Sequence, residues 1–147
     1  ANLYSTRVDP KQLLSKVNLE DKLKAKPDDL SGGQKQRFSI ACALVHNPKI
    51  LFLDEPTTGL DPQAKRNLWN LAKDLNAEGM TIVLTTHNME EAEYLCDRIA
   101  IMDQGLIIAE GTPQQLILDH APEPPKAALH GNIEDVFLAL TGHGLRD

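Results

Sequence analysis

The chain has 147 residues, of which 41% are hydrophobic and 24% charged, which fits one globular domain of ordinary size with its own core. A formal net charge of −6 makes the surface mildly acidic and argues against a nucleic-acid-binding protein. No apolar run is long enough to span a bilayer, and no signal-peptide pattern opens the chain. The two cysteines, Cys42 and Cys96, lie far apart without CxxC spacing, which favours a reducing compartment such as the cytoplasm.

The first predicted element is a short helix that begins after Asp9 and Pro10 and ends near Val17. The polar stretch 18–27 reads as a weak amphipathic turn that leads into a loop. A second helix is predicted up to residue 46, capped by Ser31 and followed by Asn47 and Pro48, which end it. Its apolar face is expected to contain residues 38, 41, 44 and 45.

A glycine pair, Gly32 and Gly33, stands at the start of this second helix. Glycines allow the backbone to approach a partner closely, and the exposed N–H groups and dipole of a helix N-terminus suit phosphate oxygens. The alternative, which a bare Ser-Gly-Gly sequence favours, is a glycine-containing N-cap without any ligand.

The stretch 50–56, Ile-Leu-Phe-Leu-Asp-Glu-Pro, predicts a strand that is buried on both faces, because its apolar residues run without alternation. Asp54 and Glu55 then stand at the carboxyl end of the strand, where ligands bind in open α/β sheets, and Pro56 stops the pairing. The alternative is a strand that merely runs into an acidic turn.

Asp61 and Pro62 predict the start of a helix that runs to about Glu78, with Leu68, Leu71, Ala72 and Leu75 as its apolar stripe and Trp69 packed beside it. A second buried strand follows over residues 80–86 and ends at His87. A strand–helix–strand unit makes the two strands parallel, so we expect His87 beside Asp54 and Glu55. A structural histidine at a strand end is the alternative.

The remaining segments are predicted to be scaffold. They comprise an acidic helix over 88–96, a hairpin of strands 98–102 and 106–109 around Asp103-Gln104-Gly105, a helix over 112–118, a proline-containing linker over 120–130, and a helix over 133–140 with Val136, Phe137 and Leu140 facing inward and Gly142 as its stop.

Taken together, the motifs Leu30-Ser31-Gly32-Gly33-Gln34, Asp54-Glu55, Gly59-Leu60-Asp61 and His87 resemble the nucleotide-binding subunits of ABC transporters in order and approximate spacing. The resemblance implies an α/β fold, a partial P-loop NTPase domain of the ABC ATPase type, in which helices flank parallel strands and a hairpin and helices follow. It also implies a division into 1–48, part of a helical subdomain with the signature motif; 49–119, a RecA-like core portion; and 120–147, a linker and C-terminal helix. The segment 131–142 resembles the closing part of exporter ATPases of the ABC-2 type.

The resemblance also implies roles for three of these side chains. Asp54 would order Mg²⁺ through coordinated water, Glu55 would polarise the water that attacks ATP, and His87 would contact the γ-phosphate. Such roles suit phosphoryl transfer, which needs charge neutralisation and a positioned nucleophile.

The other motif residues would act across a dimer of nucleotide-binding domains, either identical or different. Ser31, Gly32, Gly33 and Gln34 would complete the ATP site of the opposite subunit, and Asp61 would couple the two sites. The resemblance therefore implies ATP and Mg²⁺ as cofactors, a transmembrane permease as a further partner, and a place on the cytoplasmic face of the membrane.

One departure from the family pattern is decisive for activity. The chain nowhere contains G-x-x-x-x-G-K-[ST], the loop that cradles the β- and γ-phosphates, and it does not begin with methionine. We expect the chain to be the C-terminal portion of an ABC ATPase that is inactive by itself. Two alternatives stay open: a soluble ABC ATPase without a permease, and a non-catalytic fragment that supplies only the signature surface.

Overall fold

The computed structural model describes residues 9–121 and 132–142 of the chain. The chain forms two compact units, one that extends to Thr85 and one that begins at Thr86. The division into 1–48, 49–119 and 120–147 remains a prediction. Residues 122–131, which make up most of the predicted linker, lie outside the described residues.

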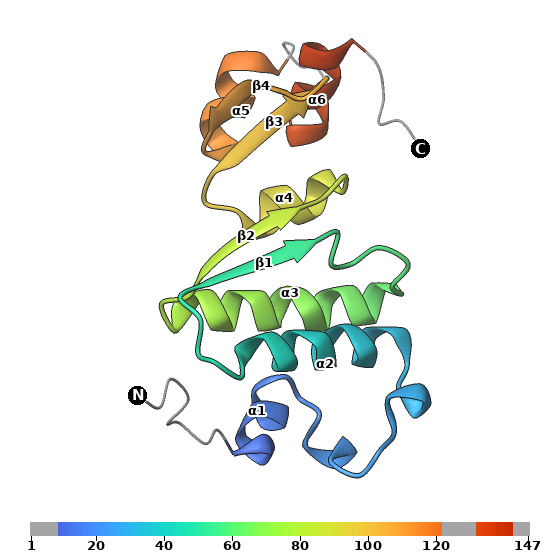
Figure 1. Cartoon of the computed structure of the whole chain (residues 1–147). Coiled ribbons are helices and arrows are strands. Elements are labelled where there is room, and N and C mark those ends of the chain that lie inside the picture. The colour runs from blue at the N-terminus through green and yellow to red at the C-terminus, as the bar shows by residue number, and fades with distance from the viewer. Residues whose placement is uncertain (1–8, 122–131, 143–147) are drawn as a thin grey trace. The chain divides into compact units, whose positions relative to one another are not determined.

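The first unit consists of a parallel pair of strands with helices packed on it (Figure 1). The strands are in register from Ile50 opposite Thr81 to Asp54 opposite Thr85, which confirms the predicted strand–helix–strand unit. Its elements in chain order are α1 (Pro10–Lys16), the 3-10 helices η1 (Glu20–Lys22) and η2 (Pro27–Asp29), α2 (Gly32–Leu44), β1 (Ile50–Asp54), α3 (Pro62–Ala77) and β2 (Thr81–Thr85).

The three longer helices of this unit begin where their N-cap residues predict. Asp9 accepts a hydrogen bond from the Lys11 N–H at 3.0 Å, and Ser31 and Asp61 cap α2 and α3 in the same way. A side-chain oxygen at this position satisfies an N–H group that has no partner inside the helix, so the cap fixes the first residue of the helix. Gly79, with a φ of 94°, follows the end of α3 as expected.

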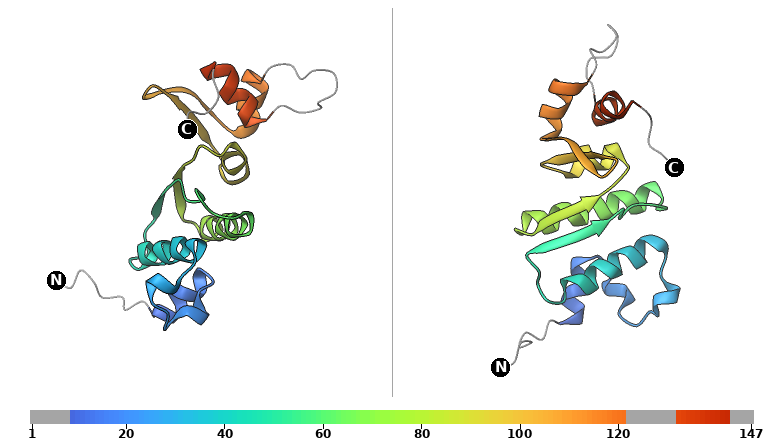
Figure 2. Two further views of the ribbon diagram at one scale, coloured as in Figure 1. Left: turned by 90° about the vertical axis from the view of Figure 1, so that its right-hand side faces the viewer. Right: turned by 45° about the horizontal axis from the view of Figure 1, so that its top comes forward.

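The core of the first unit lies between the strands and the helices. Figures 1 and 2 show α2 and α3 side by side along the β1–β2 pair, and Leu51 and Leu53 of β1 are buried in the same cluster as residues of both helices. The expected stripe of α3 is confirmed, and Trp69 is buried beside it, with 8% of its surface exposed. The buried cluster consists of Val17, Leu19, Ile40, Ala41, Leu44, Leu51, Leu53, Leu68, Leu71 and Leu75.

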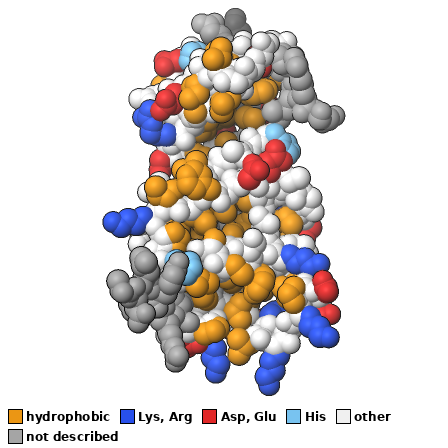
Figure 3. All heavy atoms as spheres, in the orientation of Figure 1, with side chains coloured by type: hydrophobic (Ala, Val, Ile, Leu, Met, Phe, Trp, Pro, Cys, Tyr) orange, Lys and Arg blue, Asp and Glu red, His pale blue; other side chains and the backbone are white. Residues whose placement is uncertain are grey.

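The prediction that β1 and β2 are buried on both faces is wrong for this chain. Phe52 is 74% exposed and Ile50 is 50% exposed, and Val83, which lies opposite Phe52 on β2, is 45% exposed. Hydrophobic side chains are visible over the first unit in the face shown by Figure 3. An unbroken apolar run shows that both faces avoid water, but the described residues of this unit supply helices for one face alone.

The predicted face of α2 is also partly wrong. Phe38 and Val45 are exposed, whereas Ile40, Ala41 and Leu44 are buried. Apolar residues occupy more than one side of this helix, so spacing alone did not separate the packed stripe from its flanks.

The second unit contains a hairpin and three helices. Gln104 and Gly105 form the turn of the hairpin with φ values of 48° and 80°, as the predicted turn requires. The elements are α4 (Met89–Leu95), β3 (Ile99–Asp103), β4 (Leu106–Gly111), α5 (Pro113–His120) and α6 (Ile133–Thr141), and β3 pairs antiparallel with β4.

The last helix completes the core of the second unit. Ile133 and Val136 have no exposed surface and belong to a cluster with Ala92, Ile99, Ile101 and Leu116. Phe137 and Leu140 pack against that cluster, and Gly142 ends the helix with a φ of 70°, so this predicted helix is confirmed. Of the helices in the described part of the chain, none combines the length and apolar content needed to cross a membrane.

Candidate functional site

The first predicted site residue, Asp54, ends β1 and lies directly opposite Thr85, the last residue of β2. The Thr85 hydroxyl donates a hydrogen bond to Asp54 Oδ1. Asp54 is exposed, so the rest of its carboxylate remains accessible to solvent. The parallel register therefore orients one carboxylate at the carboxyl end of the strand pair, where ligands bind in open α/β sheets.

Glu55 is held by the same threonine. Its N–H donates to the Thr85 carbonyl oxygen at 3.0 Å and lies 3.3 Å from the Thr85 hydroxyl oxygen. Its backbone has a φ of 43°, in the left-handed region, which costs a glutamate on the order of 1 kcal/mol. Glu55 Oε2 also accepts a hydrogen bond from Thr58 Oγ1 at 2.9 Å. A turn in an uncommon conformation thus follows Asp54, and Thr85 and Thr58 hold Glu55 at the end of the strand.

This pair of carboxylates fits the chemistry of a magnesium nucleotide. Mg²⁺ keeps several waters and takes only one or two protein carboxylates when phosphate oxygens supply the rest. Asp54 and Glu55 are both exposed and adjacent, so either can meet such an ion or its water. Residues 9–121 and 132–142 contain no group of three or more acidic, histidine or cysteine side chains that could hold an ion without a ligand's help.

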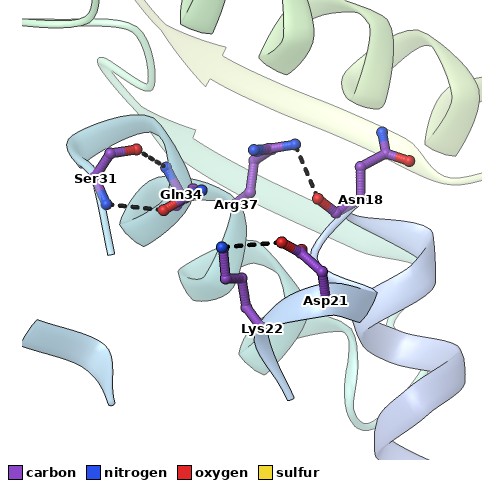
Figure 4. A network of polar contacts seen from close by, with 6 residues as sticks. All are labelled: Asn18, Asp21, Lys22, Ser31, Gln34 and Arg37. Carbon is purple, nitrogen blue, oxygen red and sulfur yellow. Dashed lines mark hydrogen bonds and ion pairs between the residues drawn. The ribbon is translucent and has the colours of Figure 1, made fainter. Parts of the chain in front are cut away.

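The predicted signature residues form the first turn of α2. The Ser31 hydroxyl oxygen accepts from the Gln34 N–H at 3.3 Å, and Gln34 Oε1 accepts from the Ser31 N–H at 3.0 Å (Figure 4). This reciprocal arrangement is a capping box, which fixes the conformation of the turn before any ligand arrives. Ser31 and Gly32 are exposed, so the turn is accessible from solvent.

Arg37, one turn further along α2, ties this helix to the connection between α1 and η1. Its Nη1 atom donates to the carbonyl oxygen of Val17 at 3.3 Å. It also donates to the carbonyl oxygen of Asn18 at 3.2 Å (Figure 4). In the adjacent η1 helix the Lys22 ammonium lies 2.9 Å from Asp21 Oδ2, and its hydrogen bond lowers the pKa of that carboxyl, as do the charges of Lys22 and Arg37 to a smaller degree.

Asp61 acts within its own chain as the cap of α3. Its Oδ1 atom accepts hydrogen bonds from the Gln63 N–H at 3.0 Å and the Ala64 N–H at 2.9 Å. The side chain is exposed at the end of the loop that follows Glu55. Its second oxygen is not used by the cap, which leaves it for a contact outside the helix.

His87 follows the end of β2 by two residues and belongs to the second unit. The chain turns at once into α4, because the Asn88 N–H donates to Thr86 Oγ1 at 2.9 Å and Asn88 Oδ1 caps the helix by accepting from the Glu91 N–H at 3.1 Å. The structure brings Asp54, Glu55 and Thr85 together within the first unit. The placement of His87 beside them stays a prediction.

Two threonines of the site were missed by the sequence reasoning. Thr85 bonds Asp54, and Thr58 bonds Glu55. A signal was available for Thr85, which is the polar end of the second strand. Two parallel strands of equal length bring their last residues opposite each other, so Thr85 could have been placed opposite Asp54.

The comparisons with known proteins show which proteins this chain resembles. A family model described as "ABC transporter" matches residues 5–58, which include the signature turn and both carboxylates. The solved structure of cbiO1 from Clostridium perfringens, part of an ABC transporter complex, has a TM-score of 0.70 and 34% identity over 75% of this chain and 44% of that one. The ADP form of the ATP-binding cassette MJ1267 has a TM-score of 0.68 and 28% identity over 78% of this chain and 47% of that one.

The chain is similar over most of its length to ATP-binding proteins of ABC transporters. Its fold is the α/β fold of the ABC ATPase P-loop domains. Curated relatives named Nod factor export ATP-binding protein I come from Burkholderia lata, with 40% identity over 93% of this chain and 62% of the relative, and from Rhizobium meliloti, with 40% identity over 92% and 55%.

The chain thus spans about three fifths of the length of the curated relatives that it matches. The alignment with the Burkholderia lata protein is also 187 positions long, whereas the chain has 147 residues, so at least 40 aligned positions of that relative have no counterpart here. This similarity consequently does not assign the activity or partners of the whole relatives to this chain.

Proposed function

We propose that the chain is part of the ATP-hydrolysing subunit of an ABC exporter, in which Asp54 and Glu55 stand at the nucleotide. The observation that carries the proposal is the hydrogen-bonded end of the β1–β2 pair, where Thr85 holds both residues. Mg²⁺ with ATP would supply the electrophilic phosphorus and neutralise its charge. Asp54 would order the ion through water, and Glu55 would accept the proton of the attacking water.

The remaining residues complete this proposal. Ser31, Gly32, Gly33 and Gln34 would bind the nucleotide of a second nucleotide-binding domain, identical or different, and Asp61 would couple the two sites. His87 would contact the γ-phosphate. The already capped turn of α2 supports the role of the signature residues, because a preformed turn loses little conformational freedom when it binds.

Export is proposed because the relatives are named as export ATP-binding proteins. A permease embedded in the membrane would then bind the substrate, and this chain would act at the cytoplasmic face. The substrate that the names of the relatives mention is not carried over, because selectivity would depend on the permease.

The decisive test joins a phosphate-loop portion of an ABC ATP-binding protein to the N-terminus of this chain. We expect Mg-dependent ATP hydrolysis from the joined protein. Glu55→Gln should lower kcat about a hundredfold or more, because a positioned base typically contributes 10²–10⁴-fold. Glu20→Gln, an exposed carboxylate on η1, is the matched control and should leave kcat unchanged. Equal rates for wild type and Glu55→Gln would remove the proposed base.

The chain alone is proposed to bind Mg·ATP very weakly and not to hydrolyse it, because its sequence contains no phosphate-cradling loop. Calorimetric titration with Mg·ATP and a phosphate-release assay test this directly. Hydrolysis by the unaltered chain that Glu55→Gln abolishes would overturn the proposal of inactivity and keep the site.

A non-catalytic role, in which the chain offers only its signature turn to a partner, is the second candidate, and the missing phosphate loop favours it. The joined protein separates the two. Nucleotide-dependent dimers without hydrolysis in any variant would support the non-catalytic role.

A further inference from the structure

The two glycines of the signature turn differ in what surrounds them. A Cβ atom built at Gly33 would lie 2.8 Å from the Cβ atom of Ala64, a separation that real Cβ atoms do not adopt. A Cβ atom built at Gly32 would lie 3.7 Å from Leu60 Cδ2, which is an ordinary contact. The first turn of α2 therefore packs on the first turn of α3 so closely that Gly33 leaves room for a hydrogen and nothing larger.

Each of these two turns carries predicted site residues and a complete cap. On α2, Ser31 and Gln34 bond each other's backbone N–H groups. On α3, Asp61 Oδ1 accepts from the N–H group of Ala64 itself at 2.9 Å. Figure 1 shows both helices beginning at the same end of the first unit, side by side. The contact thus joins two turns that are each capped by their own residues.

We propose that Ala64 is a positioning residue that makes the Ser31–Gln34 turn and the Asp61 cap move as one body. Closely packed side chains resist independent displacement, because separation opens a void and further approach causes overlap. A shift of Asp61 then moves the signature turn in the same subunit. The consequence for ATP turnover rests on the proposed function, whereas the coupling itself rests only on the packing.

Residue 33 must then be glycine because of its contact with Ala64, whether or not a ligand binds. Replacing a helical glycine by alanine usually stabilises a helix, because alanine loses less backbone freedom on folding. This gain applies equally at residues 32 and 33, which are neighbours in the first turn of α2. The contact with Ala64 alone should reverse the sign at residue 33.

The first test measures amide hydrogen exchange in the chain as it is, with four variants. Gly33→Ala should accelerate exchange of the Gln34 N–H on α2 and of the Gln63 and Ala64 N–H groups on α3, each by roughly tenfold. Gly32→Ala should accelerate neither set. The double variant Gly33→Ala/Ala64→Gly, which moves one methyl group across the contact, should restore both sets to within about threefold of the values in Ala64→Gly.

Three results would overturn the proposal. Exchange in Gly33→Ala could rise only on α2, Gly32→Ala could accelerate exchange on both helices as much as Gly33→Ala does, or the double variant could exchange as fast as Gly33→Ala. If Gly33→Ala fails to fold, far-UV circular dichroism of the double variant tests whether removing the Ala64 methyl group restores folding. Recovery of helix content is expected, and an unfolded double variant counts against the contact.

The second test follows ATP hydrolysis in the protein joined to a phosphate-loop portion. Gly33→Ala should lower kcat more than it raises KM, and the double variant should regain most of the lost kcat. A double variant that regains its exchange protection but not its turnover would overturn the positioning role in catalysis. Absence of hydrolysis from every protein, wild type included, would overturn the proposed function instead, and the exchange measurement would still decide the coupling.

Discussion

The two units complete their cores in different ways. In the second unit, α6 comes from the end of the chain and places Ile133 and Val136, both without exposed surface, against residues of α4, β3 and α5. In the first unit, Leu51 and Leu53 are buried against helices, but Ile50 and Phe52 on the other face of β1 remain exposed. The second unit thus completes its core with a helix from a later part of the chain, but both units keep exposed apolar strand residues, since Met102, Leu106 and Ile107 of the β3–β4 hairpin are 59%, 69% and 60% exposed.

The two exposed strand faces differ in the residues that stand at the ends of their strands. The β1–β2 pair of the first unit ends at the predicted carboxylates, and β1 lies in the part of the chain that the family model matches, residues 5–58. An apolar strand face that a chain does not cover itself is typical of a surface that other segments cover in the complete protein. A two-stranded parallel sheet also rarely stands alone, because parallel sheets are normally covered on both faces.

The largest expected effect concerns the core of the second unit. Ile133→Ala should reduce the free energy of unfolding of the second unit by about 3 to 4 kcal/mol, because it removes a fully buried side chain and leaves a cavity. Hydrogen exchange of the β3 and β4 amides measures this loss. The single tryptophan, Trp69, lies in the first unit, so its fluorescence follows the unfolding of that unit in urea. The midpoint of this transition should stay unchanged.

Leu138→Ala on the same helix is the matched control. Leu138 is 43% exposed, so the control should cost about 1 kcal/mol or less. If Ile133→Ala lowered the unfolding free energy measured through Trp69 fluorescence as much as that measured by β3–β4 exchange, the two units would unfold together. That result would contradict the comparison.

The next effect concerns the open face of β1. Leu53→Ala should destabilise the first unit by about 2 to 3 kcal/mol, whereas Phe52→Ala, one residue away, should change the free energy of unfolding by less than about 0.5 kcal/mol. Urea unfolding followed through Trp69 compares the two. In the protein joined to a phosphate-loop portion, the cost of Phe52→Ala should rise towards that of Leu53→Ala if the added residues cover this face. Equal costs in the chain alone would mean that the face is already covered in solution.

Local signals predicted most of the fold. Asp9, Ser31 and Asp61 each marked the start of a helix correctly, since an N-cap acts within four residues of itself. What the sequence could not predict depends on distant residues. The hydrogen bond between Thr85 and Asp54 needs the register of two strands, and the close approach of Gly33 to Ala64 needs the packing of two helices.

The exposure of Phe52 shows a different limit. Its apolar neighbours predicted burial, and the strand itself was predicted correctly, but burial also depends on whether a covering layer is present. Phe38 and Ile40 illustrate the same limit on a helix: both are apolar, and only the packing of α2 decides that Ile40 is the buried one.

A smaller effect is expected from the contact between α2 and the α1–η1 connection. Arg37→Met keeps the apolar stem but removes the hydrogen bonds to the Val17 and Asn18 carbonyl oxygens, so the first unit should lose about 1 kcal/mol. Lys35→Met, an exposed cation on the same helix, should change stability by less than about 0.5 kcal/mol. Urea unfolding through Trp69 measures both variants. Identical midpoints would show that these hydrogen bonds contribute nothing in solution.

The smallest effect contrasts one cysteine from each unit. Cys42 on α2 is exposed, whereas Cys96 after α4 packs against the core of the second unit. Burial raises the pKa of the Cys96 thiol, and the nearby Glu91 and Asp97 raise it further. Since the thiolate is the reactive form, iodoacetamide should modify Cys42 roughly tenfold faster or more at neutral pH. Peptide mass spectrometry over a time course measures both rates, and equal rates would contradict the burial of Cys96.

The raised pKa of Cys96 also fixes the sign of a pH dependence. Above the ordinary pKa of a thiol, the unfolded chain releases the Cys96 proton while the folded unit keeps it, so the unfolded state binds fewer protons and stability falls as pH rises. Below that pKa both states keep the proton and the contribution is constant. Cys96→Ala should therefore flatten the alkaline decline of stability in the second unit, followed by β3–β4 exchange, and Cys42→Ala should not. A decline that persists unchanged in Cys96→Ala would assign it to other groups and leave the contrast between the units resting on packing alone.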